Sequence, residues 1–250
     1  FTHIYNLKTG KKFRIDKSHG ANFSPDGKSL STSSGVYDLE KGMHVNSIPI
    51  GVFSPDGKFL ATSSGIYNLE TRTKMSSLVG SAFSPDGKLL ASTSGDVYNL
   101  ETGATAHDFT SGNSVAFSPD GEYLAIGGQT KRYRDGREYK YTDPITIYSL
   151  KTGEKIKSLS SVQTVKTVAY SPDGKYLSGD NAIYNLETGE LVRSFPHSIK
   201  VFSPDGKYVA AISGKEALLY RTLFQVEEEV LAQKAISRPP ALSASVSFSE

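Results

Sequence analysis

The chain has 250 residues, and its 28 lysines and arginines against 26 aspartates and glutamates give a formal net charge of +2. This small excess does not indicate a polyanionic partner, and the absence of cysteine excludes disulfides, thiolate metal sites and a cysteine nucleophile. No run of residues approaches the ~18–20 consecutive apolar residues of a membrane-spanning helix.

In chain order, the sequence opens on two predicted strands, His3–Leu7 and Lys11–Ile15, and then enters a series of repeats. The tetrapeptide SPDG marks each repeat and begins at Ser24, Ser54, Ser84, Ser118, Ser171 and Ser203. A second string, of the form I/V-Y-x-L, begins at Ile4, Val36, Ile66, Val97, Ile147 and Ile183, with a degenerate copy, LLYRTL, from Leu218. A period of about thirty residues is typical of stacked supersecondary units, none of which buries its apolar face alone.

One repeat, Ser81–Ser111, illustrates the predicted secondary structure. SAFS and LLAST are short strands joined by the turn PDG, in which Pro85 presets φ and Gly87 takes the left-handed conformation. DVYNL and ATAHDF are a third and a fourth strand, joined by a turn at ETG. Four short strands with turn signals between them predict antiparallel four-stranded meanders. Such meanders, repeated around one axis, form an all-β propeller, which leaves only short sheet edges.

The pattern F-S-P-D-G-K-x-L-A-x-S-x-G followed by I-Y-N-L-E-T-G resembles the WD-repeat β-propeller family over nearly the whole chain. The resemblance implies four-stranded blades whose loops bind protein partners. The Trp-Asp pair of the family is replaced by Tyr-Asn or Tyr-Asp, at Tyr37-Asp38, Tyr67-Asn68, Tyr98-Asn99 and Tyr184-Asn185, and the chain has no tryptophan. The family's Asp between the second and third strands and its Gly-His pair are largely missing. The hydrogen-bonded network that those residues build in the family therefore does not carry over.

The number of blades depends on how the opening strands are used. We favour seven blades, with the opening strands as the second half of a first blade that is incomplete at its N-terminal side. The alternative is six blades, in which the opening strands close the ring with the last SPDG repeat and leave Leu218–Leu223 surplus. In a third arrangement, Ser245–Glu250 supplies a returning strand for the first blade, because its sequence SVSFSE echoes SVAFSPD at Ser114–Asp120.

Residues 1–223 are therefore predicted to form the propeller, and residues 224–250 differ from the repeats. Arg238-Pro239-Pro240 is a stiff break, and the alternating segment ALSASVSFSE beyond it is typical of a strand. We expect a linker here and the start of a following β domain. The propeller would then be one domain of a larger protein, with the further domain attached covalently in the same chain.

Motifs of catalysis and metal binding are missing from the sequence. It has no G-x-S-x-G, P-loop, H-E-x-x-H or G-x-G-x-x-G string, and its five histidines never fall at a ligand spacing. The turn aspartates are interpreted as turn residues, because separate blades hold them too far apart to share one cation. They are Asp26, Asp56, Asp86, Asp120, Asp173 and Asp205. We therefore predict no catalytic residue, no metal ligand and no cofactor, and this segment is not predicted to be an enzyme.

An insertion from Gly127 to Pro144 interrupts the repeat that begins at Ser118. Its sequence, GGQTKRYRDGREYKYTDP, is typical of a hairpin with a type I′ turn at Asp135-Gly136. Inserted loops on a rigid scaffold often carry specific function, and Arg and Tyr are enriched at binding hot spots. The candidate partner-binding residues are Lys131, Arg132, Tyr133, Arg134, Arg137, Tyr139, Lys140 and Tyr141.

We therefore expect a non-catalytic scaffold that presents loops to protein partners, within a larger assembly or a multidomain chain. Two other functions stay open: a structural spacer or polymerising module, and a propeller enzyme with a central-channel site. For the hairpin itself, the alternatives are a flap that folds over its neighbouring blade and binds nothing, and a site for nucleic acid or another anionic surface. The near-neutral net charge argues against nucleic acid as the partner of the whole domain.

Overall fold

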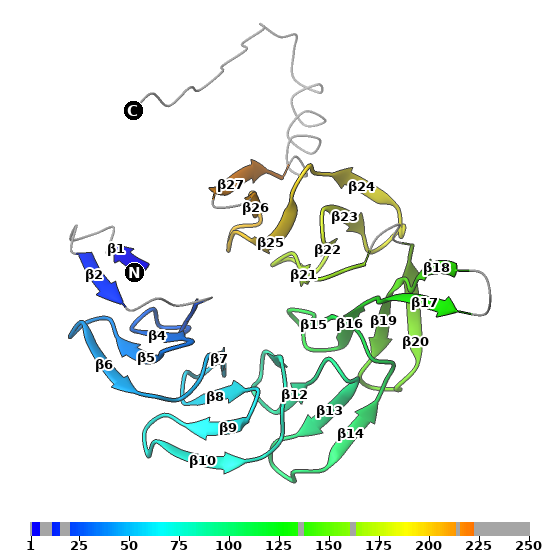
Figure 1. Cartoon of the computed structure of the whole chain (residues 1–250). Helices are drawn as coiled ribbons and strands as arrows, with labels where there is room; N and C mark the ends of the chain where they lie inside the picture. The colour runs from blue at the N-terminus through cyan, green and yellow to red at the C-terminus, as the bar shows by residue number, and fades with distance from the viewer. Residues whose placement is uncertain are drawn as a thin grey trace, which may run out of the picture.

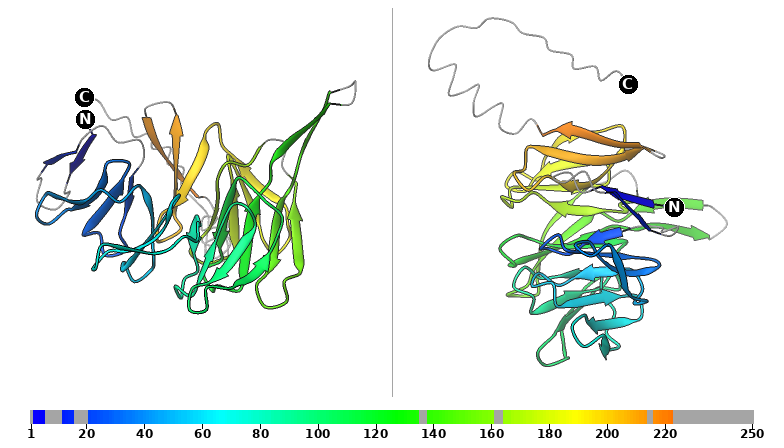
Figure 2. Two further views of the ribbon diagram at one scale, coloured as in Figure 1. Left: turned by 60° about the horizontal axis from the view of Figure 1, so that its bottom comes forward. Right: turned by 90° about the vertical axis from the view of Figure 1, so that its left-hand side faces the viewer.

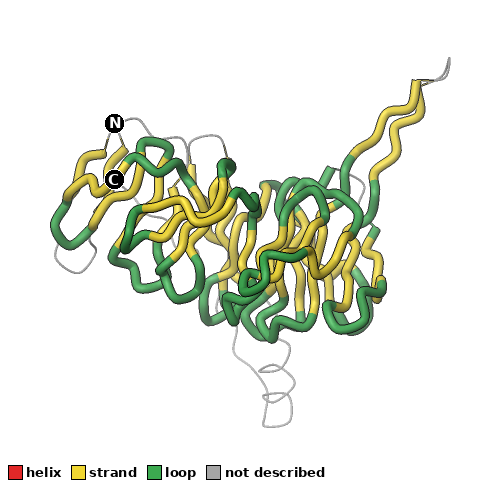
Figure 3. The backbone as a smooth tube through the Cα atoms, turned by 90° about the horizontal axis from the view of Figure 1, so that it is seen from below, coloured by secondary structure: helices red, strands yellow, loops and turns green. Residues whose placement is uncertain are grey.

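The computed structural model describes residues 2–5, 12–15, 21–134, 138–160, 164–213 and 216–222. Within these ranges the regular structure is strand, with no helix, and six sheets follow one another around an axis as the blades of a propeller (Figure 1). Figure 2 shows this row of blades from two further sides, and Figure 3 shows the chain as strands joined by loops. The predicted all-β propeller is confirmed. Over the same ranges, a search for a helix long and apolar enough to cross a membrane finds none.

Blades 1 to 3 each contain four antiparallel strands, which lie in the sheet in chain order. Blade 1 contains β3 (Ala21–Phe23), β4 (Ser29–Thr32), β5 (Gly35–Asp38) and β6 (Met43–Asn46). Blade 2 contains β7 (Gly51–Phe53), β8 (Phe59–Thr62), β9 (Gly65–Asn68) and β10 (Thr73–Ser76). Blade 3 contains β11 (Ala82–Phe83), β12 (Leu89–Ala91), β13 (Asp96–Asn99) and β14 (Thr105–Asp108).

Blades 4 and 5 also have four strands, and blade 6 has three. Blade 4 contains β15 (Ser114–Phe117), β16 (Tyr123–Gly127), β19 (Ile145–Ser149) and β20 (Lys155–Leu159). Blade 5 contains β21 (Val168–Tyr170), β22 (Tyr176–Gly179), β23 (Ala182–Asn185) and β24 (Leu191–Ser194). Blade 6 contains β25 (Ser198–Phe202), β26 (Tyr208–Ser213) and β27 (Glu216–Arg221). Two separate two-stranded sheets pair β1 (Thr2–Tyr5) with β2 (Lys12–Ile15) and β17 (Thr130–Arg134) with β18 (Glu138–Thr142).

The described residues form six blades, so the favoured count of seven is wrong and the alternative of six is observed. The six blades do not arise as that alternative supposes. β27 pairs with β26 as the third strand of blade 6, so this segment is not surplus. Among the described residues, β1 pairs with β2 alone, in a two-stranded sheet that is separate from the blades. The expected linker and following β domain, residues 224–250, lie outside the described residues.

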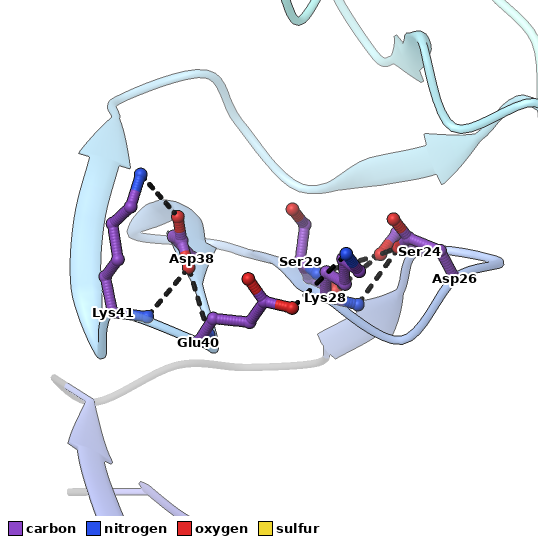
Figure 4. Close-up of polar contacts among 7 residues, drawn as sticks. All are labelled: Ser24, Asp26, Lys28, Ser29, Asp38, Glu40 and Lys41. Atoms are coloured by element: carbon purple, nitrogen blue, oxygen red, sulfur yellow. Dashed lines mark hydrogen bonds and ion pairs between the residues drawn. The ribbon is translucent and has the colours of Figure 1, made fainter.

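The SPDG turn is closed by its own serine and aspartate. In blade 1 the Ser24 hydroxyl donates to Asp26 Oδ1 at 2.6 Å and accepts from the Ser29 N–H at 2.8 Å (Figure 4). The Lys28 N–H donates to the same carboxylate oxygen at 3.0 Å. The Ser24 hydroxyl and, after it, the Lys28 N–H hold the pKa of Asp26 below its ordinary value. Gly27 has a φ of +69°, in the left-handed region that a Cβ disfavours, so the serine, the aspartate and the glycine of the motif each have a physical reason.

The asparagine of the Tyr-Asn pair caps the turn between the third and fourth strands. Asn99 Oδ1 accepts from the N–H groups of Glu101 and Thr102 at 2.9 and 3.0 Å. Asn68, Asn185 and Asp38 make the same pair of bonds in their own blades. In blades 1 to 5 the register between these two strands also shifts once, and such a bulge increases the local twist.

Apolar side chains hold each blade against the next. Val97 of β13 is fully buried in a cluster with Val115, Leu124 and Ile126 of blade 4. Blades 4 and 5 meet in the same way through a cluster that includes Ile147 of β19 and residues of β21 and β22. Because burial of one large aliphatic side chain contributes ~1.5–3 kcal/mol, each blade depends on its neighbours for stability.

The chain connections divide between two faces of the ring. One face, the motif face, carries the SPDG turns and the turns between third and fourth strands. The opposite face, the connection face, carries the links between second and third strands and the links from one blade to the next. β17 and β18 lie in the link from β16 to β19 and therefore leave the ring on the connection face (Figure 3).

Candidate functional site

The inserted segment forms the predicted hairpin, which stands away from the blades. β17 and β18 pair antiparallel over five residues each and make a sheet of their own, separate from blade 4. Figures 2 and 3 show this ribbon projecting obliquely beyond the ring. The register ends at Arg134↔Glu138, which leaves residues 135–137 between the strands. A two-residue turn at Asp135-Gly136 would instead pair Arg134 with Arg137, so the strand register does not match that part of the prediction.

The register sorts the candidate residues into two faces of the ribbon. Alternate residues of a strand lie on opposite faces, and directly paired residues share a face. The pairs Lys131↔Tyr141 and Tyr133↔Tyr139 therefore belong to one face, called here the aromatic face. The pairs Arg132↔Lys140 and Arg134↔Glu138 belong to the other, called the basic face. Seven of the eight candidates thus lie on this ribbon, and the eighth, Arg137, lies outside the described residues.

The root of the hairpin is fastened to the segments on both sides of blade 4. The Gly128 carbonyl accepts from Asn113 Nδ2, in the link before the blade, and from the Val165 N–H, in the link after it, both at 3.2 Å. The Asp143 N–H donates to the Gln129 carbonyl at 2.9 Å and closes the neck of the ribbon. A Cβ on Gly128 would lie 1.9 Å from the Asp143 carbonyl oxygen, so this close approach requires glycine. A cavity of about 400 Å³ lies beside the root.

A second hollow lies between blades 4 and 5 and reaches the motif face. Its volume is about 580 Å³, and its lining includes Tyr123, Tyr170 and Tyr176 together with Ile147 and Ile156. The corresponding hollow between blades 2 and 3, of about 430 Å³, is lined by phenylalanines at the positions of the first two tyrosines. A hollow therefore occurs at both junctions, and the one between blades 4 and 5 is larger and more polar.

Tyr170 gives this hollow its most unusual polar atom. Its hydroxyl is shielded from solvent and has no hydrogen-bond partner among the described residues. Burial and, after it, the negative charge of Asp120 raise the pKa of Tyr170 above its ordinary value. The side chain is therefore a neutral phenol whose hydroxyl can still donate a hydrogen bond. Nothing else in the lining selects a ligand class, so the hollow is a weaker candidate than the hairpin.

Side chains on three outer strands fasten neighbouring blades together. Lys157 Nζ donates to the carbonyl oxygens of Leu186 and Glu187 in blade 5, at 2.5 and 2.9 Å. His107 Nε2 lies 2.8 Å from the Leu150 carbonyl oxygen of blade 4, and Arg193 Nη1 donates to the Arg221 carbonyl oxygen of blade 6 at 3.2 Å. These three residues occupy the same position in their repeats. Their role here is structural, and His107 belongs to this set and not to a reactive site.

The turn aspartates and His44 also have structural partners. Each turn aspartate accepts from its own motif serine, as the six bonds of 2.5–2.6 Å show. His44 Nε2 lies 3.0 Å from the Ser34 carbonyl oxygen. Over the described residues, no group of three or more histidines, aspartates and glutamates is placed to hold a metal ion.

The match to a known repeat lies in the middle of the chain. A family model described as WD domain, G-beta repeat matches residues 101–136, which include the fourth strand of blade 3 and the first two strands of blade 4. A chain of the structure titled Crystal Structure of Mitotic Checkpoint Complex superposes with a TM-score of 0.65, at 19% identity, over 88% of this chain and 83% of that chain. The chain has the β-propeller fold, and its residues 101–136 match the WD repeat.

Other comparisons show how widespread this propeller fold is. Hydrazine synthase of Kuenenia stuttgartiensis superposes with a TM-score of 0.62, at 19% identity, over 88% of this chain and 89% of that chain. In all, 558 chains of solved structures resemble the propeller, so no single neighbour selects a function. A search of curated proteins finds no match to the sequence. At 19% identity these neighbours support the fold alone. One is named as an enzyme and the other as part of a protein complex, so their names do not agree on a function.

Sequence reasoning did not reveal the hollow at Tyr170 or the fastening side chains of the outer strands. The hollow has a faint signal, because the repeats carry tyrosine in place of phenylalanine at Tyr123 and Tyr170. The fastening residues have none, since His107, Lys157 and Arg193 share only a positive or polar end and their partners are backbone carbonyls.

Proposed function

We propose that this propeller is a non-catalytic scaffold that docks a protein partner on the β17–β18 hairpin. The observation that carries the proposal is the hairpin itself: a ribbon rooted by Gly128 and Asp143 that projects beyond the ring on the connection face. WD-repeat propellers typically mediate protein interactions and usually are not enzymes, which supports a binding role. The projecting ribbon also argues against the alternative of a flap folded over a neighbouring blade.

The two faces of the hairpin favour a protein over an anionic polymer. By strand alternation Tyr133, Tyr139 and Tyr141 hold positions on one face of the ribbon, and tyrosine supplies large contact area at low entropic cost. A two-stranded ribbon also offers edge N–H and C=O groups with which an extended segment of a partner can pair. The basic face would add charge complementarity and faster association with an acidic partner.

The test separates the two faces by substitution. The aromatic-face variant carries Tyr133→Ser, Tyr139→Ser and Tyr141→Ser, and the basic-face variant carries Arg132→Gln, Arg134→Gln and Lys140→Gln. A partner captured on the immobilised parent chain is identified by mass spectrometry, purified and titrated against each variant. We expect the aromatic-face variant to lose at least tenfold in affinity, about 1.4 kcal/mol, and the basic-face variant to lose mainly association rate.

A polyanionic ligand would give the opposite pattern. A single-stranded oligonucleotide is titrated against the same proteins at several salt concentrations. If nucleic acid were the ligand, binding to the parent would weaken steeply with salt, and the basic-face variant would remove both the binding and that slope. Full partner binding by the aromatic-face variant would overturn the proposed docking site.

A further inference from the structure

The hollow between blades 4 and 5 differs from its counterpart between blades 2 and 3 by added hydroxyl groups. Tyr123 and Tyr170 line it where the counterpart has phenylalanine. Tyr170 directly precedes its SPDG motif, and the other five repeats all have phenylalanine at this position: Phe23, Phe53, Phe83, Phe117 and Phe202. Because the motif that follows is unchanged, the hydroxyl of Tyr170 is a local feature of this one junction.

The Tyr170 hydroxyl lowers the stability of the unliganded protein. It is shielded from solvent and has no hydrogen-bond partner among the described residues, and a shielded polar group without a partner is unfavourable. Phenylalanine, which the other repeats have here, would avoid that cost. Buried polar groups without a partner are rare in folded proteins, and a bound molecule that supplies the missing bond is one physical reason for them.

The hollow has the size and the walls of a small-molecule site. Its volume of about 580 Å³ lies within the ~300–1,000 Å³ range of ligand pockets. Tyr123, Tyr176 and Ile156 contribute apolar surface to the lining, and Ile156 is 53% exposed. Aromatic rings pack favourably against tyrosine rings in offset or edge-to-face arrangements. These walls therefore favour a ligand with a flat apolar body.

The charge beside the Tyr170 hydroxyl selects an uncharged acceptor. The negative charge of Asp120 acts on Tyr170 strongly enough to raise its pKa, after burial as the larger cause. The same charge would repel a carboxylate or phosphate oxygen at the hydroxyl. An ammonium group has no lone pair with which to accept the bond, so it would leave the Tyr170 donor unused. A neutral oxygen, such as that of a carbonyl group, meets both conditions.

We propose that this hollow binds a small uncharged molecule with a flat apolar body and a neutral oxygen that accepts a hydrogen bond from Tyr170. The hydroxyl is shielded in the unliganded protein, so side chains of the lining must move aside as the ligand enters. Lys175 and Glu187 in that lining are exposed, and exposed side chains change rotamer within nanoseconds. The site reaches the motif face, whereas the hairpin leaves the ring on the connection face.

Benzamide is the probe, because it joins a flat ring to a neutral carbonyl oxygen. Toluene, benzoate and benzylamine are its comparisons, since they lack the acceptor or carry a negative or positive charge. Binding to the full 250-residue protein is followed by backbone amide chemical shifts. We expect shifts at residues 174–176 and 185–187, and a Kd for benzamide that is lower than that of each comparison by about fivefold or more.

Tyr170→Phe removes the hydroxyl and keeps the shape of the ring. We expect it to raise the Tm of the unliganded protein and to weaken benzamide binding by about fivefold, to the level of toluene. The matched control is Tyr208→Phe, at a half-buried tyrosine of blade 6 that does not line this hollow. It should change neither the Tm nor the binding of benzamide.

Three results would overturn the proposal. A lower Tm for Tyr170→Phe than for the parent would show that the hydroxyl already has a partner. Equal benzamide binding by the parent and Tyr170→Phe, or no shifts at the lining residues, would show that the hydroxyl receives no ligand. Tighter binding of benzoate or benzylamine would show that the site selects a charged group. None of these results depends on the hairpin, so the docking proposal is tested separately.

Discussion

Removal of the Ser84 hydroxyl tests how an SPDG turn stabilises its blade. Ser84 is buried, and its hydroxyl donates to Asp86 Oδ1 at 2.6 Å and accepts from the Leu89 N–H at 2.9 Å. Ser84→Ala takes this acceptor from the Leu89 N–H, and an unpaired shielded donor costs about 1–3 kcal/mol. For a domain of this size each kcal/mol shifts Tm by about 2–4 °C, so we expect Tm to fall by about 2–12 °C in thermal melts followed by circular dichroism.

The pH dependence of the same variant tests the cause. The Ser84 hydroxyl and, after it, the Lys88 N–H hold the pKa of Asp86 below its ordinary value of 3.8. A carboxyl group with a depressed folded-state pKa contributes stability that is present above the unfolded-state pKa and lost as pH falls through the folded-state pKa. The parent should therefore lose stability below about pH 4, and Ser84→Ala should lose less over that range.

Two measurements can refute this reasoning. The matched control is Ser158→Ala, at an exposed serine on β20, which should leave Tm unchanged. Equal melting temperatures for Ser84→Ala and Ser158→Ala would show that the buried hydroxyl contributes nothing. A carbon-detected NMR titration in which the Asp86 carboxyl has the same midpoint in parent and Ser84→Ala would show that the serine does not depress its pKa.

Three further substitutions test the turn, the junctions and the core. Gly57 has a φ of +72°, so Gly57→Val should lower the free energy of unfolding in urea by about 1–3 kcal/mol, and Gly57→Asn should lower it much less. Equal losses for the two variants would show that φ is not the cause. Lys157→Met removes the donor to two carbonyl oxygens of blade 5 and should speed amide hydrogen exchange in residues 186–189. Lys155→Met, at an exposed neighbour, should leave that exchange unchanged. Identical exchange rates in the two variants would refute the fastening role. Leu124 is fully buried, so Leu124→Ala should lower the free energy of unfolding by about 2–5 kcal/mol, and a loss below about 1 kcal/mol would contradict its place in the core.

The strands and turns could be predicted because each is specified within a few residues of sequence. The serine, aspartate and glycine of the SPDG turn bond to one another and to the strand that follows, as at Ser24. The asparagine of the Tyr-Asn pair bonds to N–H groups two and three residues ahead, as at Asn99. The hairpin strands followed from the alternating pattern around Asp135-Gly136.

The features that escaped prediction are those made between blades. The number of blades depended on whether β1 pairs with a strand besides β2. No local sequence pattern specifies that pairing. The hollow beside Tyr170 and the bond from Lys157 to blade 5 depend on how two separate sheets approach each other. The exposure of Leu219 is invisible in the string LLYRTL, because burial at the equivalent positions comes from the next blade and not from the strand itself.

Deletion of the hairpin is the most direct test of the docking proposal. Replacing Gln129–Asp143 with Ser-Gly should preserve the propeller, because β16 keeps its pairing with β15 and β19. The proposal predicts a Tm close to that of the parent and a loss of at least tenfold in affinity for the protein partner, about 1.4 kcal/mol. Undiminished partner binding by the deletion variant, at every salt concentration measured, would contradict it.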